Sequence, residues 1–181
     1  IEKIPNLKPW LVGRWSPYPN DCISATHGTF VAGIALYGDD CQGKNWIQHK
    51  GMKLFDAAVF PDTDKEGIEE DELIANIKEA IKKFHKQVKI WNLSISIKRP
   101  VVDTKFSDFA IALDSLQDKY DVLICKSAGN CSNFANNLPK GRIHEGADSV
   151  RSLVVGSFAH DKSIYDYAEI NDPSPFSRIG P

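Results

Sequence analysis

Apolar residues recur along this chain with two different spacings, which separate the expected helices from the expected strands. From Leu73 to Phe84 the apolar positions lie three or four residues apart and charged residues fill the other face, as in an amphipathic helix. Acidic residues precede this stretch and lysines end it, which suits the helix dipole. A second helix is predicted at about residues 105–119 and a short one at residues 27–36.

Short apolar runs without helical spacing predict strands. They occupy residues 52–60, 88–95, 121–125 and 153–158. Residues 1–25 are rich in proline, tryptophan and polar side chains and are interpreted as a loop, and residues 37–51 as a turn-rich connection. Strands that alternate with helices form parallel crossovers, so the pattern predicts an α/β fold with a mostly parallel sheet flanked by helices.

Composition is that of an ordinary globular chain. Its 181 residues suggest one domain or a large part of one. The net charge of −2 indicates no basic surface for nucleic acid, and no apolar run approaches the roughly 20 residues of a membrane span. The four cysteines form no C-x-x-C pair, so no metal site is predicted, and no cofactor is expected.

The cysteines are Cys22, Cys41, Cys125 and Cys131. Cys125 falls inside an apolar run and is expected to be a buried free thiol. Free thiols favour a reducing, cytoplasmic compartment over a disulfide framework. Localisation is nevertheless left open, because the N-terminus of the parent protein is not visible in this sequence.

Two segments lie at the carboxyl ends of two of the predicted strands. They are Ser94, Ile95 and Ser96 at the end of one apolar run, and Ser127, Ala128, Gly129 and Asn130 beyond another. Ligands bind beyond the carboxyl ends of parallel strands, so these two segments form the candidate site. A nucleotide-binding domain would share this layout, but neither G-x-G-x-x-G after the first strand nor G-x-x-x-x-G-K-[ST] occurs, which makes nucleotide binding the weaker interpretation.

His27 opens the short helix predicted at residues 27–36. Ser24 or Thr26 can cap this helix, and the glycines at positions 28 and 33 leave room for close backbone packing. A neutral imidazole can accept a proton from a serine hydroxyl and return it to a leaving amine. The local context by itself fits a core histidine and a general base equally well.

Asn130 also has two interpretations. An asparagine after Gly129 at a strand end is often a turn residue, since asparagine tolerates left-handed backbone. Alternatively, its amide donates a hydrogen bond to the negative charge that develops on a tetrahedral intermediate. The run Asn92-Leu93-Ser94, taken alone, is most simply a buried strand running into a turn.

Four sequence blocks follow one another in order. H-G-T-F-V-A-G begins at His27, N-L-S at Asn92, S-A-G-N at Ser127, and F-S-R-I-G-P at Phe176. In this order they resemble the signature blocks of the subtilisin-like (subtilase) serine proteases. The first block is specific, the third moderately so, and N-L-S carries weight only beside the others.

The resemblance implies a three-layer α/β sandwich and hydrolysis of peptide bonds through an Asp/His/Ser triad. It implies catalytic roles for His27, as general base, and for Asn130, as oxyanion donor. Ser94–Ser96 and Ser127–Gly129 would bind an extended peptide or protein substrate through main-chain hydrogen bonds. Ser96 stands where the family usually has glycine, a difference that would narrow the pocket.

Two members of the implied triad are not found in the chain. Ile1 resembles the isoleucine that follows the family's D-[ST]-G motif, so the aspartate is expected just before residue 1. The serine of the G-T-S-M-A block is expected after Pro181. Three residues inside the chain lack the required contexts: Asp21, Ser127 and Ser132.

Residues 1–181 are therefore interpreted as one incomplete subtilase catalytic domain that is inactive alone. A naturally short, inactive homologue is the other explanation for the missing residues. A peptide-binding pseudoprotease or interaction module is the alternative function.

Overall fold

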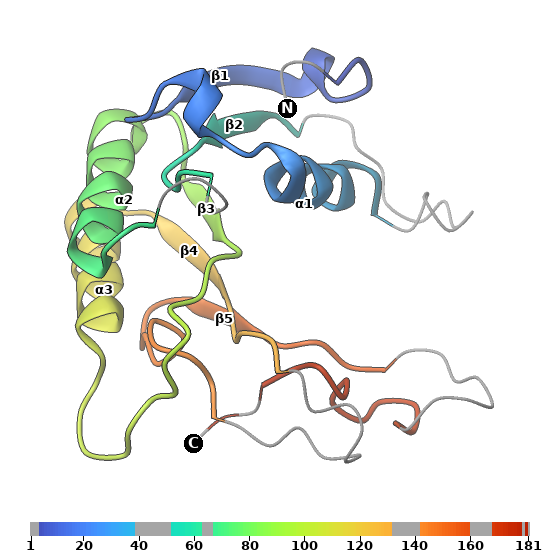
Figure 1. Ribbon diagram of the computed structural model, residues 1–181, viewed down its shortest axis with the longest axis vertical. Helices are drawn as coiled ribbons and strands as arrows, with labels where there is room; N and C mark the ends of the chain where they lie inside the picture. The colour runs from blue at the N-terminus through green and yellow to red at the C-terminus, as the bar shows by residue number, and fades with distance from the viewer. Residues whose placement is uncertain are drawn as a thin grey trace. The chain divides into compact units, whose positions relative to one another are not determined.

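The computed structural model describes residues 4–38, 52–62, 67–131, 142–159, 168–178 and 180 (Figure 1). The chain divides into two compact units, Ile1–Lys83 and Phe84–Pro181. That residues 1–181 make up a single piece of one catalytic domain stays a prediction.

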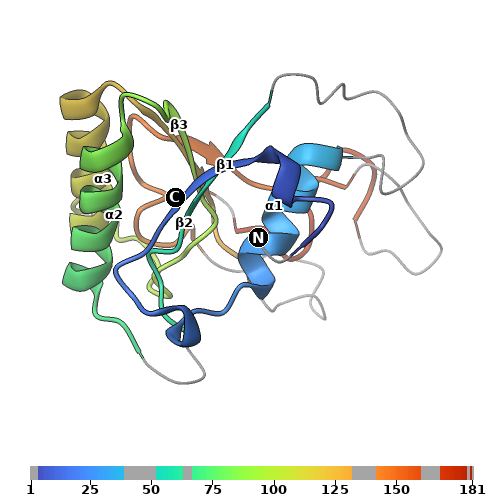
Figure 2. The same ribbon diagram turned by 90° about the horizontal axis from the view of Figure 1, so that it is seen from above.

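The first unit contains a two-stranded parallel sheet. β1 (Leu11–Trp15) pairs with β2 (Leu54–Ala57), and Figure 2 shows the two strands side by side. β2 confirms the strand predicted at residues 52–60. The interpretation of residues 1–25 as loop was wrong, since they include β1 and two short 3₁₀ helices, Lys8–Trp10 and Asn20–Cys22.

The hydrophobic pattern does not predict β1, because its side chains are only half-buried or exposed and it contains a glycine. Gly13 is required there by packing, since a Cβ at this position would lie 2.7 Å from Cε2 of the Phe55 ring on β2. A glycine inside a short strand weakens the apolar alternation on which strand prediction depends. Only the pairing with β2 reveals the strand.

Two helices complete the first unit. α1 (Thr26–Tyr37) confirms the helix predicted at residues 27–36, and it buries Leu36 against Leu7. α2 (Glu70–Phe84) confirms the amphipathic helix, and only its last residue belongs to the second unit. The buried amide of Asn76 on α2 donates to the hydroxyl of Tyr18 at 2.8 Å, which ties α2 to the segment after β1.

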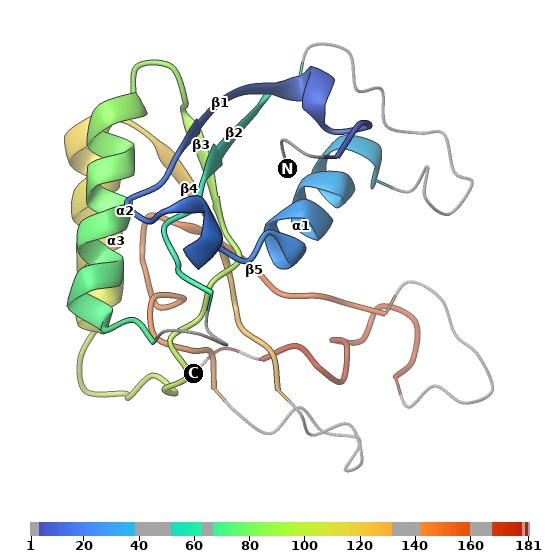
Figure 3. The same ribbon diagram turned by 45° about the horizontal axis from the view of Figure 1, so that its top comes forward.

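The second unit is a three-stranded parallel sheet. β3 (Ile90–Leu93), β4 (Leu123–Ser127) and β5 (Leu153–Val155) lie in the order β3-β4-β5, and Figure 3 shows them running together. The predicted strands at residues 88–95, 121–125 and 153–158 are confirmed, with ends that differ by at most three residues. The parallel pairing confirms the α/β class.

The core of this unit lies between β4 and α3 (Asp108–Tyr120), which confirms the helix predicted at residues 105–119. Phe109 and Leu113 on α3 and Ile124 on β4 are almost fully buried. Two residues further along β4, Lys126 is also fully buried. A lysine in this position is unusual, because burial of an ammonium group is costly without a partner.

Candidate active site

His27 is the second residue of α1, in the first unit, and its side chain is exposed. The prediction that Ser24 or Thr26 caps this helix was wrong. The N-cap residue is Ala25, and no side chain there accepts a capping hydrogen bond.

The glycines beside His27 have open space around them. A Cβ built on Gly28 or Gly33 would meet no atom within 4 Å, so close packing in the described structure does not require either glycine. The interpretation of these glycines as sites of close backbone packing was therefore wrong. His27 is exposed in the described structure, and its role as a general base stays a prediction.

Asn130 lies in the second unit, three residues beyond the end of β4, and it is exposed. Gly129 precedes it with φ +99°, a left-handed conformation that glycine adopts readily. Asn130 forms an isolated antiparallel bridge with Ser177, and the N–H of Cys131 donates to the carbonyl of Phe176 at 2.8 Å. The main chain of Asn130 is thus fixed, and its side-chain amide has no hydrogen-bond partner among the described residues.

The predicted substrate segments lie at the carboxyl ends of β3 and β4, which form one end of the sheet. Leu93 at the end of β3 pairs with Lys126 on β4, so Ser94 and Ser127 each follow a paired residue. Ser94, Ile95 and Ser96 are half-buried, Ser127 ends β4, and Ala128 and Gly129 are buried. The structure therefore brings together the predicted site residues of the second unit, while His27 belongs to the first unit.

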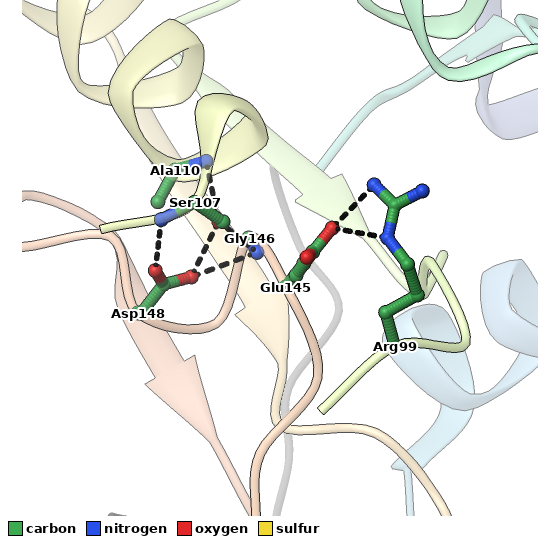
Figure 4. A network of polar contacts seen from close by, with 6 residues as sticks. All are labelled: Arg99, Ser107, Ala110, Glu145, Gly146 and Asp148. Atoms are coloured by element: carbon green, nitrogen blue, oxygen red, sulfur yellow. Dashed lines mark hydrogen bonds and ion pairs between the residues drawn. The ribbon is translucent and has the colours of Figure 1, made fainter. Parts of the chain in front are cut away.

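A loop at residues 142–148 joins this edge and was not predicted as part of the site. The N–H of Val101 donates to the carbonyl of Ile143 at 3.0 Å, and the N–H of His144 to the carbonyl of Ala128 at 3.2 Å. Arg99 forms an ion pair with Glu145 at 2.6 Å (Figure 4). The loop is thus held between the segment after β3 and the segment after β4.

The imidazole of His144 is buried near the carboxyl end of β4. Its side chain is beside Gly129, with Nδ1 2.9 Å from the place where a Cβ on Gly129 would lie. Nδ1 is buried and has no hydrogen-bond partner in the described structure. Burial is the main cause of the lowered pKa of His144, and three positive charges lower it further: Arg178, Lys126 and Lys98. Both the burial and the positive charges thus favour the neutral form of the imidazole.

Lys126 directly precedes the Ser127–Asn130 segment at the end of β4. Its Nζ donates to the carbonyl oxygen of Ser127 at 2.8 Å. Burial lowers the pKa of Lys126 to about 8, and the charge of Asp148 opposes only part of that shift. The sequence offers one signal for this group, a charged residue in the middle of an apolar run.

Asp148 belongs to a hydrogen-bond network at the start of α3 (Figure 4). Its carboxylate accepts from the N–H of Ser107 at 2.6 Å, from the Ser107 hydroxyl at 2.7 Å and from the N–H of Gly146 at 2.9 Å. The Ser107 hydroxyl in turn accepts from the N–H groups of Ala110 and Gly146. The network joins the first turn of α3 to the loop that carries His144.

The cysteines differ in part from expectation. Cys22, Cys125 and Cys131 are free thiols, while Cys41 lies outside the described residues. Cys125 is half-buried, so the prediction of full burial was wrong, because alternate residues of β4 face the core and Cys125 lies between the buried Ile124 and Lys126.

The described residues offer neither a cluster of metal ligands nor a membrane-spanning helix. They contain no group of three or more His, Cys, Asp or Glu side chains placed to hold a metal ion. No helix among them has the length and apolar character needed to span a bilayer.

Comparison with solved structures identifies the class of fold. The chain resembles a mutant form of the protease domain of PatA with a TM-score of 0.55 and 22% sequence identity. The match covers 94% of this chain and 54% of that one, so the chain spans about half of the domain it resembles.

The sequence pattern of the subtilase family matches residues 14–181. The chain therefore belongs to the subtilase family, whose members are serine proteases. A comparison with curated protein sequences finds no match. The predicted family and the α/β fold class are confirmed.

Proposed function

We propose that this chain supplies part of the active site of a subtilisin-like serine endopeptidase. His27 acts as general base and Asn130 as oxyanion donor, while the aspartate and the nucleophilic serine of the triad come from outside residues 1–181. The 181 residues alone then form no acyl-enzyme, because they lack the nucleophile.

One observation supports this proposal above the others, namely the geometry of Asn130. Hydrogen bonds fix the main chain on both sides of this residue, whereas its exposed amide has no partner among the described residues. An oxyanion donor must be held in place before the charge develops, so that it does not reorganise during the reaction.

The substrate is proposed to be a peptide or protein in extended conformation. Ser94–Ser96 and Ser127–Gly129 lie at the carboxyl ends of the neighbouring parallel strands β3 and β4. In this proposal the substrate adds a strand beside these two segments. Ser96 is half-buried there, and its hydroxymethyl group narrows the space that a glycine would leave.

The test uses the intact protein with two substitutions at position 130. Asn130→Leu removes the donor at similar volume, and Asn130→Asp removes the donor but keeps a residue that tolerates the same turn. Both should lower kcat by about 10²–10³ with little change in KM, the magnitude known for such a donor in subtilisin, a member of this family.

A turn role predicts a different result. Asn130→Asp would then turn over normally, and Asn130→Leu would lose only folded protein. Turnover is counted per active site by titration with a fluorophosphonate probe. Failure of the intact wild-type protein to react with the probe would instead favour the peptide-binding pseudoprotease.

A further inference from the structure

Arg178 connects three segments of the second unit. Its Nε donates to the carbonyl oxygen of Asn130 at 2.8 Å, and its Nη1 donates to the carbonyl oxygen of Arg142 at 2.9 Å. Its own N–H donates to the carbonyl oxygen of Gly129 at 3.2 Å. The side chain is half-buried and has no carboxylate partner among the described residues. This guanidinium therefore binds main-chain carbonyls where an arginine would more often pair with an acid.

The two carbonyls at Gly129 and Asn130 belong to the peptide groups on either side of the Asn130 Cα. Arg178 binds the first through its main-chain N–H and the second through Nε of its guanidinium. The second peptide is held again through the N–H of Cys131, which donates to Phe176. Fixing both peptide planes fixes φ and ψ at Asn130, and with them the direction of its Cα–Cβ bond.

Gly129 makes such a restraint necessary. With φ +99° and no Cβ, it has more accessible backbone conformations than any other residue type would have at that position. The Arg178 side chain also fills the space beside it, since a Cβ on Gly129 would lie 3.1 Å from the Arg178 Cδ. Gly129 gives the peptide group that leads into Asn130 conformational freedom, and Arg178 restrains it.

We propose that Arg178 is a positioning residue for the oxyanion donor, because its guanidinium holds the Asn130 main chain in the orientation that aims the amide. This inference rests on the proposed role of Asn130. Lysine cannot replace arginine here, since a single ammonium does not present the planar fork that reaches two separate carbonyls.

The experiment measures kcat and KM of the intact protein with Arg178→Lys, which keeps the charge, and Arg178→Met, which keeps most of the stem. Both should lower kcat about ten- to a hundredfold with KM little changed, because small misplacement of a catalytic group is that costly. Arg151→Met is the matched control. Arg151 pairs with Asp118 at 2.8 Å, away from this edge, and its loss should leave kcat unchanged.

A double-variant cycle separates positioning from general stability. If Arg178 acts through Asn130, Arg178→Met should lower kcat by less than twofold in the Asn130→Leu background. An equal loss in both backgrounds, an effect confined to KM, or no loss with Arg178→Lys would each overturn the inference while leaving the proposed function standing. If Asn130→Leu alone leaves kcat unchanged, the proposed function itself fails and the inference with it. Should Arg178→Met fail to fold, Arg178→Lys decides.

Discussion

Replacement of the buried Lys126 by methionine should change how the stability of this protein depends on pH. The Lys126 side chain is fully buried in β4 and its pKa is lowered from 10.5 to about 8, mainly by burial. Between these two values the unfolded chain keeps a proton that the folded chain has lost. The free energy of unfolding therefore rises with pH across this window.

The magnitude follows from the pKa difference. Each pKa unit corresponds to about 1.4 kcal/mol, so the full shift corresponds to about 3 kcal/mol of destabilisation at neutral pH. Methionine has a similar stem and no charge, and it removes this penalty. The advantage of Lys126→Met over wild type should therefore be greatest near pH 7 and should shrink by about 2–3 kcal/mol by about pH 10.

Denaturant unfolding of both proteins across this pH range measures the effect. Lys105→Met is the matched control, since it removes an exposed lysine of the same unit. A constant difference between wild type and Lys126→Met from about pH 7 to about pH 10 would refute the argument that burial destabilises the ammonium form.

Three further predictions follow from the structure. The purified 181-residue chain should show no reaction with a fluorophosphonate probe, and labelling of it would contradict the placement of the nucleophile outside residues 1–181. Gly146→Ala should destabilise the protein by about 2–4 kcal/mol in thermal or urea unfolding, because φ is +88° and the added Cβ would strike the buried Phe109 ring. The control is Gly28→Ala, because Gly28 lies in a helix with open space around it. This variant should be neutral or stabilising by up to about 1 kcal/mol. Arg178→Met should raise the pKa of His144, followed by its ring-proton NMR shifts, because burial is the first cause of the lowered pKa and the Arg178 charge the second; an unchanged value would show that this charge does not act on the imidazole.

The elements with strong periodicity could be predicted from the sequence. α2 has a clean apolar face with acidic residues in its first turn and lysines in its last, so local pattern and tertiary role agree. β1 could not be predicted, because Gly13 is present to make room for Phe55, a residue more than forty positions away. Packing of that kind leaves no periodic trace in the sequence.

The candidate site was predicted in part for a similar reason. Asn130 and the residues after β3 and β4 could be found because strand ends are visible as the close of an apolar run. His144 and Arg178 belong to the site because they contact Gly129. In the sequence they lie 15 and 49 residues after it, so no local pattern connects them with it. Lys126 was visible as a charge in an apolar run, yet only the fold shows that it faces the core.

The shared hydrogen bonds of Ser107 have a consequence for local opening of the protein. One hydroxyl oxygen accepts from Ala110 in the first turn of α3 and from Gly146 in a loop 39 residues later. Fraying of the helix at that end breaks a hydrogen bond that holds the loop, and lifting of the loop at Gly146 breaks one that holds the cap of the helix. The two segments therefore form one cooperative unit in hydrogen exchange, and the Ala110 and Gly146 amides should exchange with the same opening free energy. The loop that carries His144 thereby shares the slow opening of a packed helix, although it has no regular secondary structure of its own.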